Sequence, residues 1–529
     1  MKKLLMACAT AALCTSMAAA PAQAETFRYA GPVSPLTFDP HATNDFTTIA
    51  VLSQFYDTLL AIGPNMESLP GIATEWESVD ESTWRFTIRD DVTFHDGTAL
   101  TPEDVAFSIE RGRKSGYYGA LFGKITSATV SGDNTVDVTS SLPDPILPEK
   151  MIRMFIFSKA WLEEHDAVEI PDLSADVAAY TVTHENGTGP MKLVSHKADV
   201  ETRMEAFDGY WGEVTGNVTE AIYTPISAAP TRIASLLSGE VDAITNVPLQ
   251  DIERLEANDY TITTAPQLLW IQLEMDGSRD VALEVFDKDG TPLETNPWKD
   301  VRVRQAVAQA VNADAIVERL LRGRARVMGE ATIPEIGGYQ PDMDDHWPYD
   351  PEAAKALLAE AGYPDGFQTS MNCPNERYVN IEDVCRAVSS MLARVGIDVK
   401  VNSMAWPEFA KLLVQGPSSS FHAIGVASVW DTQDAFLSIM KTRDTEAGEG
   451  FFNWALWSDP EFDAITDKLR VEFDPETREA LYREGLSLAK ERVNAVYLYQ
   501  NQLIWAARPG IEGTMRSDSV LNLTTLTVE

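Results

Sequence analysis

Cysteine is scarce in this chain of 529 residues, and histidine is only slightly more frequent. The cysteines are Cys8, Cys14, Cys373 and Cys385, and there are seven histidines. No two cysteines form a CxxC pair, and no histidines form an HxH or HxxxH array, which are spacings typical of zinc sites. The sequence therefore predicts no metal site and no cofactor, while ligands that are distant in sequence stay open.

Long apolar segments are absent after the first two dozen residues, so nothing beyond residue 24 is expected to span a bilayer. The start is basic at Lys2 and Lys3, apolar from residue 4 to about residue 20, and then reads Ala22-Gln23-Ala24. This order is typical of a secretory signal peptide, residues 1–24, with cleavage before Glu25. A membrane anchor is the alternative, but the apolar run is at the short end for spanning and a cleavage site follows it at once.

Neither early cysteine suits lipid attachment, because Cys14 follows Leu13 rather than a small residue and Cys8 lies too near the start. Both leave with the predicted signal peptide, so the exported chain keeps only Cys373 and Cys385. An exported pair of cysteines is interpreted first as a disulfide. We expect one here, which requires the two Cα atoms to lie within about 7 Å.

Basic residues are few. Lys and Arg number 42 against 80 Asp and Glu, and removal of Lys2 and Lys3 with the signal leaves 40 against 80. Nucleic acid is therefore excluded as a partner, because phosphate backbones need a basic surface. The acidity has two interpretations, and both stay open here. The negative charge could attract a cationic ligand, or it could form a solvated surface suited to a saline environment.

Motifs of common enzyme sites are also missing. The chain contains no G-x-S-x-G, G-x-x-x-x-G-K-[ST], G-x-G-x-x-G or H-E-x-x-H sequence. The run from Gly187 to Pro190 superficially resembles a phosphate loop, but Pro190 lacks the backbone donor that such a loop needs. A turn is the simpler interpretation. Binding without chemistry is favoured over catalysis.

Helix-to-strand transitions recur along the 505 residues that follow the signal, and 44% of the chain is apolar. This length suggests two or three domains, and the transitions indicate an α/β protein with partly parallel sheets. Strands are predicted at Phe27–Ala30, Trp84–Ile88, Val241–Ile244 and Ile397–Val401. Helices are predicted after Thr101 and after Asp350, each with proline at the first position, at Arg232–Leu237 before Gly239, and at Val384–Val395 before Gly396.

Short motifs in a fixed order carry a family resemblance. They include Pro35-Leu36-Thr37-Phe38-Asp39-Pro40-His41, Gln54-Phe55-Tyr56-Asp57-Thr58-Leu59-Leu60, Phe94-His95-Asp96-Gly97-Thr98, Gly187-Thr188-Gly189-Pro190, Tyr210-Trp211-Gly212, Val301-Arg302-Val303-Arg304-Gln305-Ala306 and Ala506-Ala507-Arg508-Pro509-Gly510-Ile511. From about residue 27 to 513 the order is similar to family 5 extracellular solute-binding proteins, the dipeptide, oligopeptide and nickel binders of ABC importers.

The resemblance implies a periplasmic binding protein type II clamshell of two lobes with an extra third domain. By analogy, domain I comprises 25–63, 186–264 and 493–529, the extra domain II comprises 64–185, and the second lobe, domain III, comprises 265–492. It also implies a periplasmic monomer that captures a small molecule and delivers it to the permease subunits of an ABC transporter in the inner membrane.

Peptide-binding members of the family hold the ammonium group of the ligand with an aspartate after a Trp-rich turn. Asp431 best matches that place, next to Trp430, although Ala427-Ser428 stands where the family has Gly-Trp. Asp434 is the competing carboxylate, and either residue could instead cap a helix beginning near Ala435.

A second segment, Asn375-Glu376-Arg377-Tyr378, loosely resembles the site of the arginine that binds the ligand carboxylate in dipeptide binders. A planar guanidinium suits that task, so Arg377 is a candidate, with a plain surface arginine as the alternative. Trp430, Trp406 and Phe46 are candidate apolar walls of the binding cleft. A peptide or amino-acid derivative is the expected ligand. An oligosaccharide, an opine or a nickel complex is the alternative, and a periplasmic enzyme or chaperone on the same scaffold is a third reading.

Overall fold

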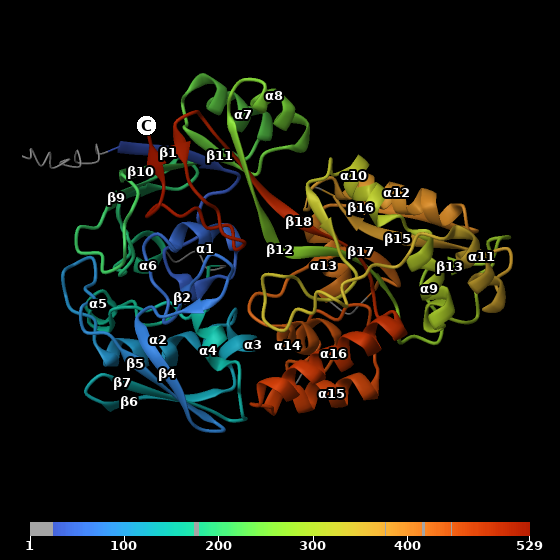
Figure 1. The fold of residues 1–529 in the computed structure, drawn as a ribbon, viewed down its shortest axis with the longest axis horizontal. Coiled ribbons are helices and arrows are strands. Elements are labelled where there is room, and N and C mark those ends of the chain that lie inside the picture. The colour runs from blue at the N-terminus through green and yellow to red at the C-terminus, as the bar shows by residue number, and fades with distance from the viewer. Residues whose placement is uncertain (1–24, 174–178, 376, 415–417, 446) are drawn as a thin grey trace, which may run out of the picture.

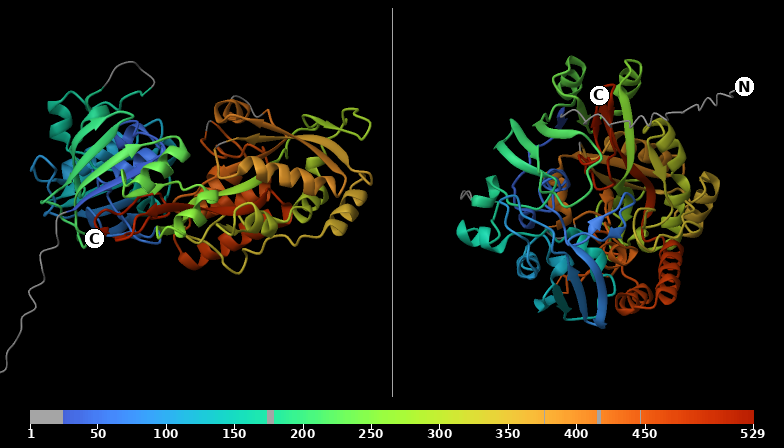
Figure 2. Two further views of the ribbon diagram at one scale, coloured as in Figure 1. Left: turned by 90° about the horizontal axis from the view of Figure 1, so that it is seen from above. Right: turned by 60° about the vertical axis from the view of Figure 1, so that its left-hand side comes forward.

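The structure, a computed structural model, describes residues 25–173, 179–375, 377–414, 418–445 and 447–529. The predicted signal peptide lies outside the described residues. Two lobes lie side by side and are joined by the long strands β12 and β18 (Figure 1). The same two bodies are seen from above (Figure 2). Within the described ranges, no helix is both long and apolar enough to cross a membrane.

A single 12-stranded sheet runs through both lobes, with the order β13-β15-β17-β12-β18-β11-β1-β10-β9-β8. Outside this order, β14 pairs with β18 and β16 pairs with β15. Strand β12 (Thr261–Met275) pairs antiparallel with β18 (Val496–Ala507), so the two connections between the lobes are themselves ladder strands. The boundary expected between residues 264 and 265 lies inside β12. Because a shared strand belongs to both lobes, the domain division stays a prediction.

Lobe 1 is built on β1 (Glu25–Gly31), which pairs in parallel with β10 (Val218–Pro225) and β11 (Ala243–Thr245). The expected strand at Phe27–Ala30 lies within β1. The other elements are β8 (Met191–Lys197), β9 (Glu201–Ala206), β19 (Ile511–Glu512), β20 (Thr527–Val528), η1 (Pro40–Ala42), α1 (Phe46–Leu52), α7 (Ala229–Ser238), η3 (Leu249–Asp251) and α8 (Ile252–Glu256). Helix α7 ends as expected at Gly239, whose φ of 74° favours glycine.

A smaller antiparallel sheet lies below lobe 1 in Figure 1, with the order β4-β5-β7-β6. Its strands are β4 (Ala73–Asp80), β5 (Thr83–Ile88), β6 (Ile125–Gly132) and β7 (Thr135–Ser140). Around it lie β2 (Ala61–Ile62), β3 (Ser68–Leu69), α2 (Pro102–Gly112), α3 (Gly119–Phe122), α4 (Leu147–Lys150), η2 (Met151–Arg153), α5 (Lys159–Glu164) and α6 (Tyr180–Thr183). The helix predicted after Thr101 is confirmed as α2, and it begins with a capping box, since the Thr101 hydroxyl and the Asp104 carboxylate each accept the other's backbone N–H.

Lobe 2 has a parallel core in which β15 (Phe367–Pro374) pairs with both β16 (Ile397–Met404) and β17 (Phe421–Val426). Its other elements are β13 (Val285–Phe286), β14 (Ala325–Val327), η4 (Pro297–Lys299), α9 (Val301–Ala310), α10 (Ala313–Arg319), α11 (Pro351–Glu360), α12 (Ile381–Ala393), α13 (Trp406–Val414), α14 (Thr432–Ala435), the π-turn η5 (Phe436–Met440), α15 (Pro460–Val471) and α16 (Pro475–Arg492). Helix α11 starts after Asp350 as predicted, whereas α12 starts three residues before Val384.

Cys373, in β15, and Cys385, in α12, are joined by a disulfide, with Cα atoms 6.5 Å apart. The sequence reasoning required a separation within about 7 Å. The bond fastens α12 to the end of the parallel sheet that leads into the segment around Arg377.

Replacing both cysteines by serine is expected to lower the free energy of unfolding by roughly 2 to 3 kcal/mol, because a short loop is no longer closed in the unfolded chain. Chemical denaturation of the double variant measures this loss. Mapping of non-reduced peptides that finds both thiols free would contradict the disulfide.

Candidate functional site

Three of the predicted ligand residues follow the carboxyl ends of the parallel strands of lobe 2. Arg377 comes shortly after β15, Trp406 directly begins the helix after β16, and Asp431 follows β17. Because carboxyl ends of parallel strands meet at one edge of a sheet, these residues share an edge, which is where ligands bind in open α/β sheets.

Asp431 is buried, with 6% of its surface exposed, and one of its two oxygens makes all of its hydrogen bonds. Oδ1 accepts from the Tyr482 hydroxyl at 2.6 Å, from the backbone N–H of Gln433 at 2.7 Å and from the Arg478 guanidinium at 3.5 Å. Among the described residues, none donates to Oδ2. Burial raises the pKa of Asp431, and the charge of Arg478 is the largest influence opposing that rise.

The capping alternative for Asp431 is correct, but the helix starts earlier than expected. Asp431 is the N-cap of α14, which begins at Thr432 rather than near Ala435. Gly337 packs against this turn, because its N–H donates to Trp430 O and a Cβ there would lie 2.6 Å from Asp431 Oδ2. Capping occupies Oδ1, so Oδ2 remains available for a further contact.

Asp434, the competing carboxylate, accepts a hydrogen bond from the Ser428 hydroxyl at 3.1 Å. Burial raises the pKa of Asp434 to about 7. Near neutral pH it is therefore only partly ionised.

Two charged residues of α4, which sequence reasoning missed, interact electrostatically with Asp431. Burial raises the pKa of Glu149 in α4 to about 7, and the charge of Asp431 raises it further. The charge of Lys150 acts in the opposite direction on Asp431. In Figure 1 the region of α3 and α4 lies next to α14 of the other lobe. Nothing near Glu149 in the sequence marks this contact, because it joins segments almost 300 residues apart.

The lobes also touch through apolar side chains. Met66, in the β2–β3 hairpin, is buried in the lobe 2 cluster that contains Leu268, Trp270 and Met328. The rings of Trp84 and Phe473 stack with centroids 6.3 Å apart. The Asp431 turn therefore lies at a junction between the lobes.

The other predicted residues of lobe 2 are more open to solvent. Arg377 is exposed, and its guanidinium carbon lies 4.7 Å from the centre of the half-buried Trp406 ring. No contact between Arg377 and Asp431 is formed. Trp430 is half-buried, but its indole N–H is buried and has no partner among the described residues.

Phe46, the predicted wall from lobe 1, is the first residue of α1 and follows the N-cap Asp45, which accepts from Thr48 N–H. It is half-buried. The guanidinium carbon of Arg153, at the end of η2, lies 5.4 Å from the centre of its ring. Phe46 and Arg153 are therefore neighbours.

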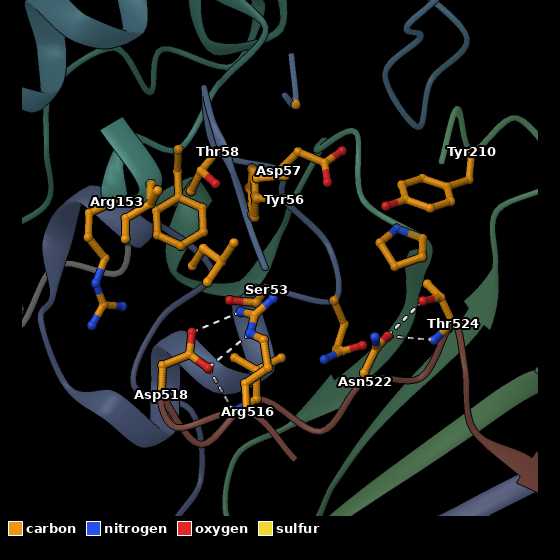
Figure 3. A pocket seen from close by; sticks show the side chains of 18 of the residues that line it. Ser53, Tyr56, Asp57, Thr58, Arg153, Tyr210, Arg516, Asp518, Asn522 and Thr524 are labelled. Atoms are coloured by element: carbon orange, nitrogen blue, oxygen red, sulfur yellow. Dashed lines mark hydrogen bonds and ion pairs between the residues drawn. The ribbon is translucent and has the colours of Figure 1, made fainter. Parts of the chain in front are cut away.

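Arg153 also lines a polar cavity of about 210 Å³ (Figure 3). Its lining includes Asp57, Arg153, Tyr210, Arg516, Asp518 and Asn522. Trp211 and Thr188 donate to Asp57 Oδ2 at 2.7 and 2.9 Å, and burial raises the pKa of Asp57 to about 6. Sequence reasoning assigned none of this lining to a site, and the residues named come from four distant segments.

Glu330 is a buried acid in the segment that leads to Gly337. It is 3% exposed, neither carboxyl oxygen has a hydrogen-bond partner among the described residues, and burial, with the charge of Asp344, raises its pKa to about 8. An unfolded glutamate titrates near about 4.3. The folded protein therefore takes up a proton between pH 9 and 7 that the unfolded chain does not bind.

Stability is accordingly expected to rise by about 1 kcal/mol as the pH falls from 9 to 7, since the folded pKa lies above the unfolded one. Glu330→Gln removes this contribution, and urea unfolding at both pH values measures it. If the free energy of unfolding changes equally between pH 9 and pH 7 in the variant and the wild type, Glu330 is ionised at pH 7.

Comparison with known proteins identifies the family. A model of bacterial extracellular solute-binding proteins, family 5 (Middle), matches residues 67–446, more than half of the chain. The chain belongs to this family. Within the described residues, no group of three or more His, Cys, Asp or Glu is placed to hold a metal ion.

Relatives of this family-5 protein cover nearly its whole length. It is 27% identical over 523 residues to the dipeptide-binding protein of Escherichia coli K12. The aligned residues make up 94% of this chain and 93% of that relative. It is 25% identical over 491 residues to the glutathione-binding protein of Pectobacterium atrosepticum, covering 90% and 89%.

The fold agrees with solved structures. The ABC transporter-associated periplasmic binding protein DppA of Helicobacter pylori, in complex with the peptide STSA, superposes with a TM-score of 0.74 at 22% identity and covers 96% of this chain and 98% of that one. The predicted type II clamshell is confirmed.

Proposed function

We propose that this chain is the periplasmic substrate-binding component of an ABC importer. It captures a small solute, a peptide or an amino-acid derivative, between its two lobes and delivers it to the permease subunits. Residues 1–24 export it, and it acts as a monomer without catalysing a reaction.

The observation that carries the proposal is a pair of unused polar groups on neighbouring residues. Within the part of the chain that the structure describes, no donor reaches Asp431 Oδ2, and no acceptor reaches the buried indole N–H of Trp430. Buried polar groups are normally paired, so such groups at a lobe junction fit a partner that arrives with closure. A zwitterion supplies both partners: an ammonium for Asp431 and a carbonyl oxygen for Trp430.

The names of the relatives support a peptide-like solute, since one is a dipeptide-binding and another a glutathione-binding protein. An oligosaccharide, an opine or a nickel complex remains the alternative solute. An enzyme or chaperone would differ from all of these by forming product or by binding unfolded chains rather than one small molecule.

Small molecules carried through purification of the native protein, identified by mass spectrometry, test the proposal. Calorimetry against di- and tripeptides, free amino acids, neutral oligosaccharides and Ni–histidine then ranks the solute classes. A stoichiometric peptide at a hundred times its dissociation constant should stabilise the protein by roughly 2.7 kcal/mol. Product formed from a bound peptide would overturn the assignment as a binding protein.

The start of the exported protein is a separate prediction. N-terminal sequencing of the protein from the periplasmic fraction is expected to begin at Glu25, because the AQA site ends at Ala24. A lipid-modified start at Cys14 would contradict it.

A further inference from the structure

The tip of the β2–β3 hairpin carries one buried side chain on an otherwise exposed turn. Pro64, Asn65 and Glu67 are exposed, whereas Met66 between them is only 5% exposed. A connecting turn of this kind normally lies in solvent, and an apolar side chain at its tip has no core of its own to enter. The burial of Met66 therefore comes from another part of the molecule.

The backbone of Met66 adopts a conformation that methionine disfavours. The Met66 N–H donates to Gly63 O at 3.0 Å, which closes the turn, and the φ of Met66 is 66°. The residue that follows such a turn in the left-handed region is usually glycine, because a Cβ is unfavourable there. Methionine at this position is therefore strained, and its contacts must offset the strain.

The contacts of the Met66 side chain lie across the lobe junction. In the described part of the chain, every other buried member of its apolar cluster lies within residues 268–497, and Ile62 at the end of β2 packs against the same cluster. The chain just before the hairpin is bonded to the other side of the junction, where the Leu59 N–H donates to Met154 O at 2.9 Å. The hairpin thus reaches from lobe 1 into lobe 2.

The stack of Trp84 on Phe473 joins the lobes further from the crossover strands. Trp84 lies in β5 and Phe473 in the turn between α15 and α16, and their ring planes differ by 23°. The indole N–H of Trp84 donates to Asp144 O at 3.0 Å, which fixes the orientation of the ring. In Figure 1, β5 and α15 lie at the bottom of the picture, away from β12 and β18. Rotation of the lobes about these two strands separates the rings.

We propose that the β2–β3 hairpin is a closure latch. Met66 enters the apolar cluster of lobe 2 when the lobes come together, the Trp84–Phe473 stack forms in the same arrangement, and both contacts stabilise it. Solute affinity depends on the latch, because the apparent affinity falls with the population of the binding-competent arrangement. The latch rests on the proposed function only for this affinity, and it gives a role to residues outside the candidate ligand contacts.

Met66→Gly tests the latch, because glycine is favoured at a φ of 66° and the turn is kept while the side chain is lost. Small-angle X-ray scattering of the ligand-free variant is expected to give a larger radius of gyration than that of wild type. Its affinity for the dipeptide Met-Leu, measured by calorimetry, is expected to fall by about tenfold, since burial of a methionine side chain changes an equilibrium constant by at least that factor. Met66→Leu keeps an apolar side chain and should match wild type in both measurements.

Two further variants separate the contact between the lobes from the change in the backbone. Asp199→Gly makes the same kind of backbone change in the exposed turn between β8 and β9, where φ is 59°, and should alter neither measurement. Phe473→Ala removes the second contact and should increase the radius of gyration in the same direction as Met66→Gly. The double variant Met66→Gly, Phe473→Ala should be more extended than either single variant, because the two contacts lie apart and add.

The radius of gyration decides between a latch and a fixed packing contact. An unchanged radius in ligand-free Met66→Gly overturns the latch, and a lower melting temperature alone would then show that Met66 only holds the hairpin in place. Failure of the proposed function is seen separately. If wild type does not bind Met-Leu, the peptide assignment fails, while the radii of the ligand-free variants still decide the latch.

Discussion

Replacing Asp431 by asparagine is expected to weaken the binding of a zwitterionic dipeptide by about two orders of magnitude or more. The substitution removes the negative charge opposite the ammonium while keeping the shape and the helix cap, since Asn caps nearly as well as Asp. An uncompensated charge inside a closed site costs roughly 3 to 5 kcal/mol, and each 1.4 kcal/mol corresponds to about a tenfold change in affinity. Isothermal calorimetry with Met-Leu measures the effect.

Asp459 provides a matched control. It is also a helix N-cap, accepting from the backbone N–H groups of Glu461 and Phe462, and it also pairs with an arginine, Arg492 at 3.2 Å. Asp459→Asn therefore repeats the chemistry away from the lobe junction and should leave affinity unchanged. If a neutral sugar binds tightly and Asp431→Asn leaves its affinity unchanged, the zwitterion model fails and the oligosaccharide reading replaces it.

Asp434→Asn separates the two candidate carboxylates. Because burial raises the pKa of Asp434 to about 7, much of this group is already neutral at pH 7, and its replacement should cost little affinity. The loss caused by Asp434→Asn should become smaller still at pH 6, where more of Asp434 is protonated. A larger loss in Asp434→Asn would exchange their roles.

Elements with local signals were predictable from the sequence. Helix α2 starts where a threonine, a proline and an acid follow each other, and the capping box at Thr101 is complete within four residues. Helix α7 stops at a glycine with positive φ. The crossover strand β12 was not located, because its 15 residues are defined by pairing with β17 and β18, more than 100 residues away in the chain.

The site was predictable only where a family pattern marks it. Asp431 could be located from the Trp-rich turn, but the residues that orient its carboxylate, Arg478 and Tyr482, lie 47 and 51 residues further on.

The buried pair of Arg111 and Asp39 gives the largest expected effect on stability. Arg111, in α2, donates to both oxygens of Asp39 at 3.0 and 2.6 Å, and the two residues are 4% and 0% exposed. Asp39 belongs to the motif that leads into α1, so the pair fastens the start of lobe 1 to the smaller domain. Arg111→Met is expected to lower the free energy of unfolding by roughly 3 to 5 kcal/mol, because it leaves a buried carboxylate with too few donors.

A variant of Arg85 is the control that distinguishes the effect of burial from the effect of the two-bond geometry. It also binds an aspartate through two N–H groups, Asp137 at 2.7 and 2.7 Å, but its side chain is 36% exposed. Arg85→Met should therefore cost far less stability than Arg111→Met. In the double variant Asp39→Asn, Arg111→Met, neither partner keeps a buried charge, so stability should partly recover relative to Arg111→Met alone. Urea unfolding followed by circular dichroism gives all three values. Equal losses for Arg111→Met and Arg85→Met would show that water reaches Asp39, and the pair would then contribute no more than a surface salt bridge.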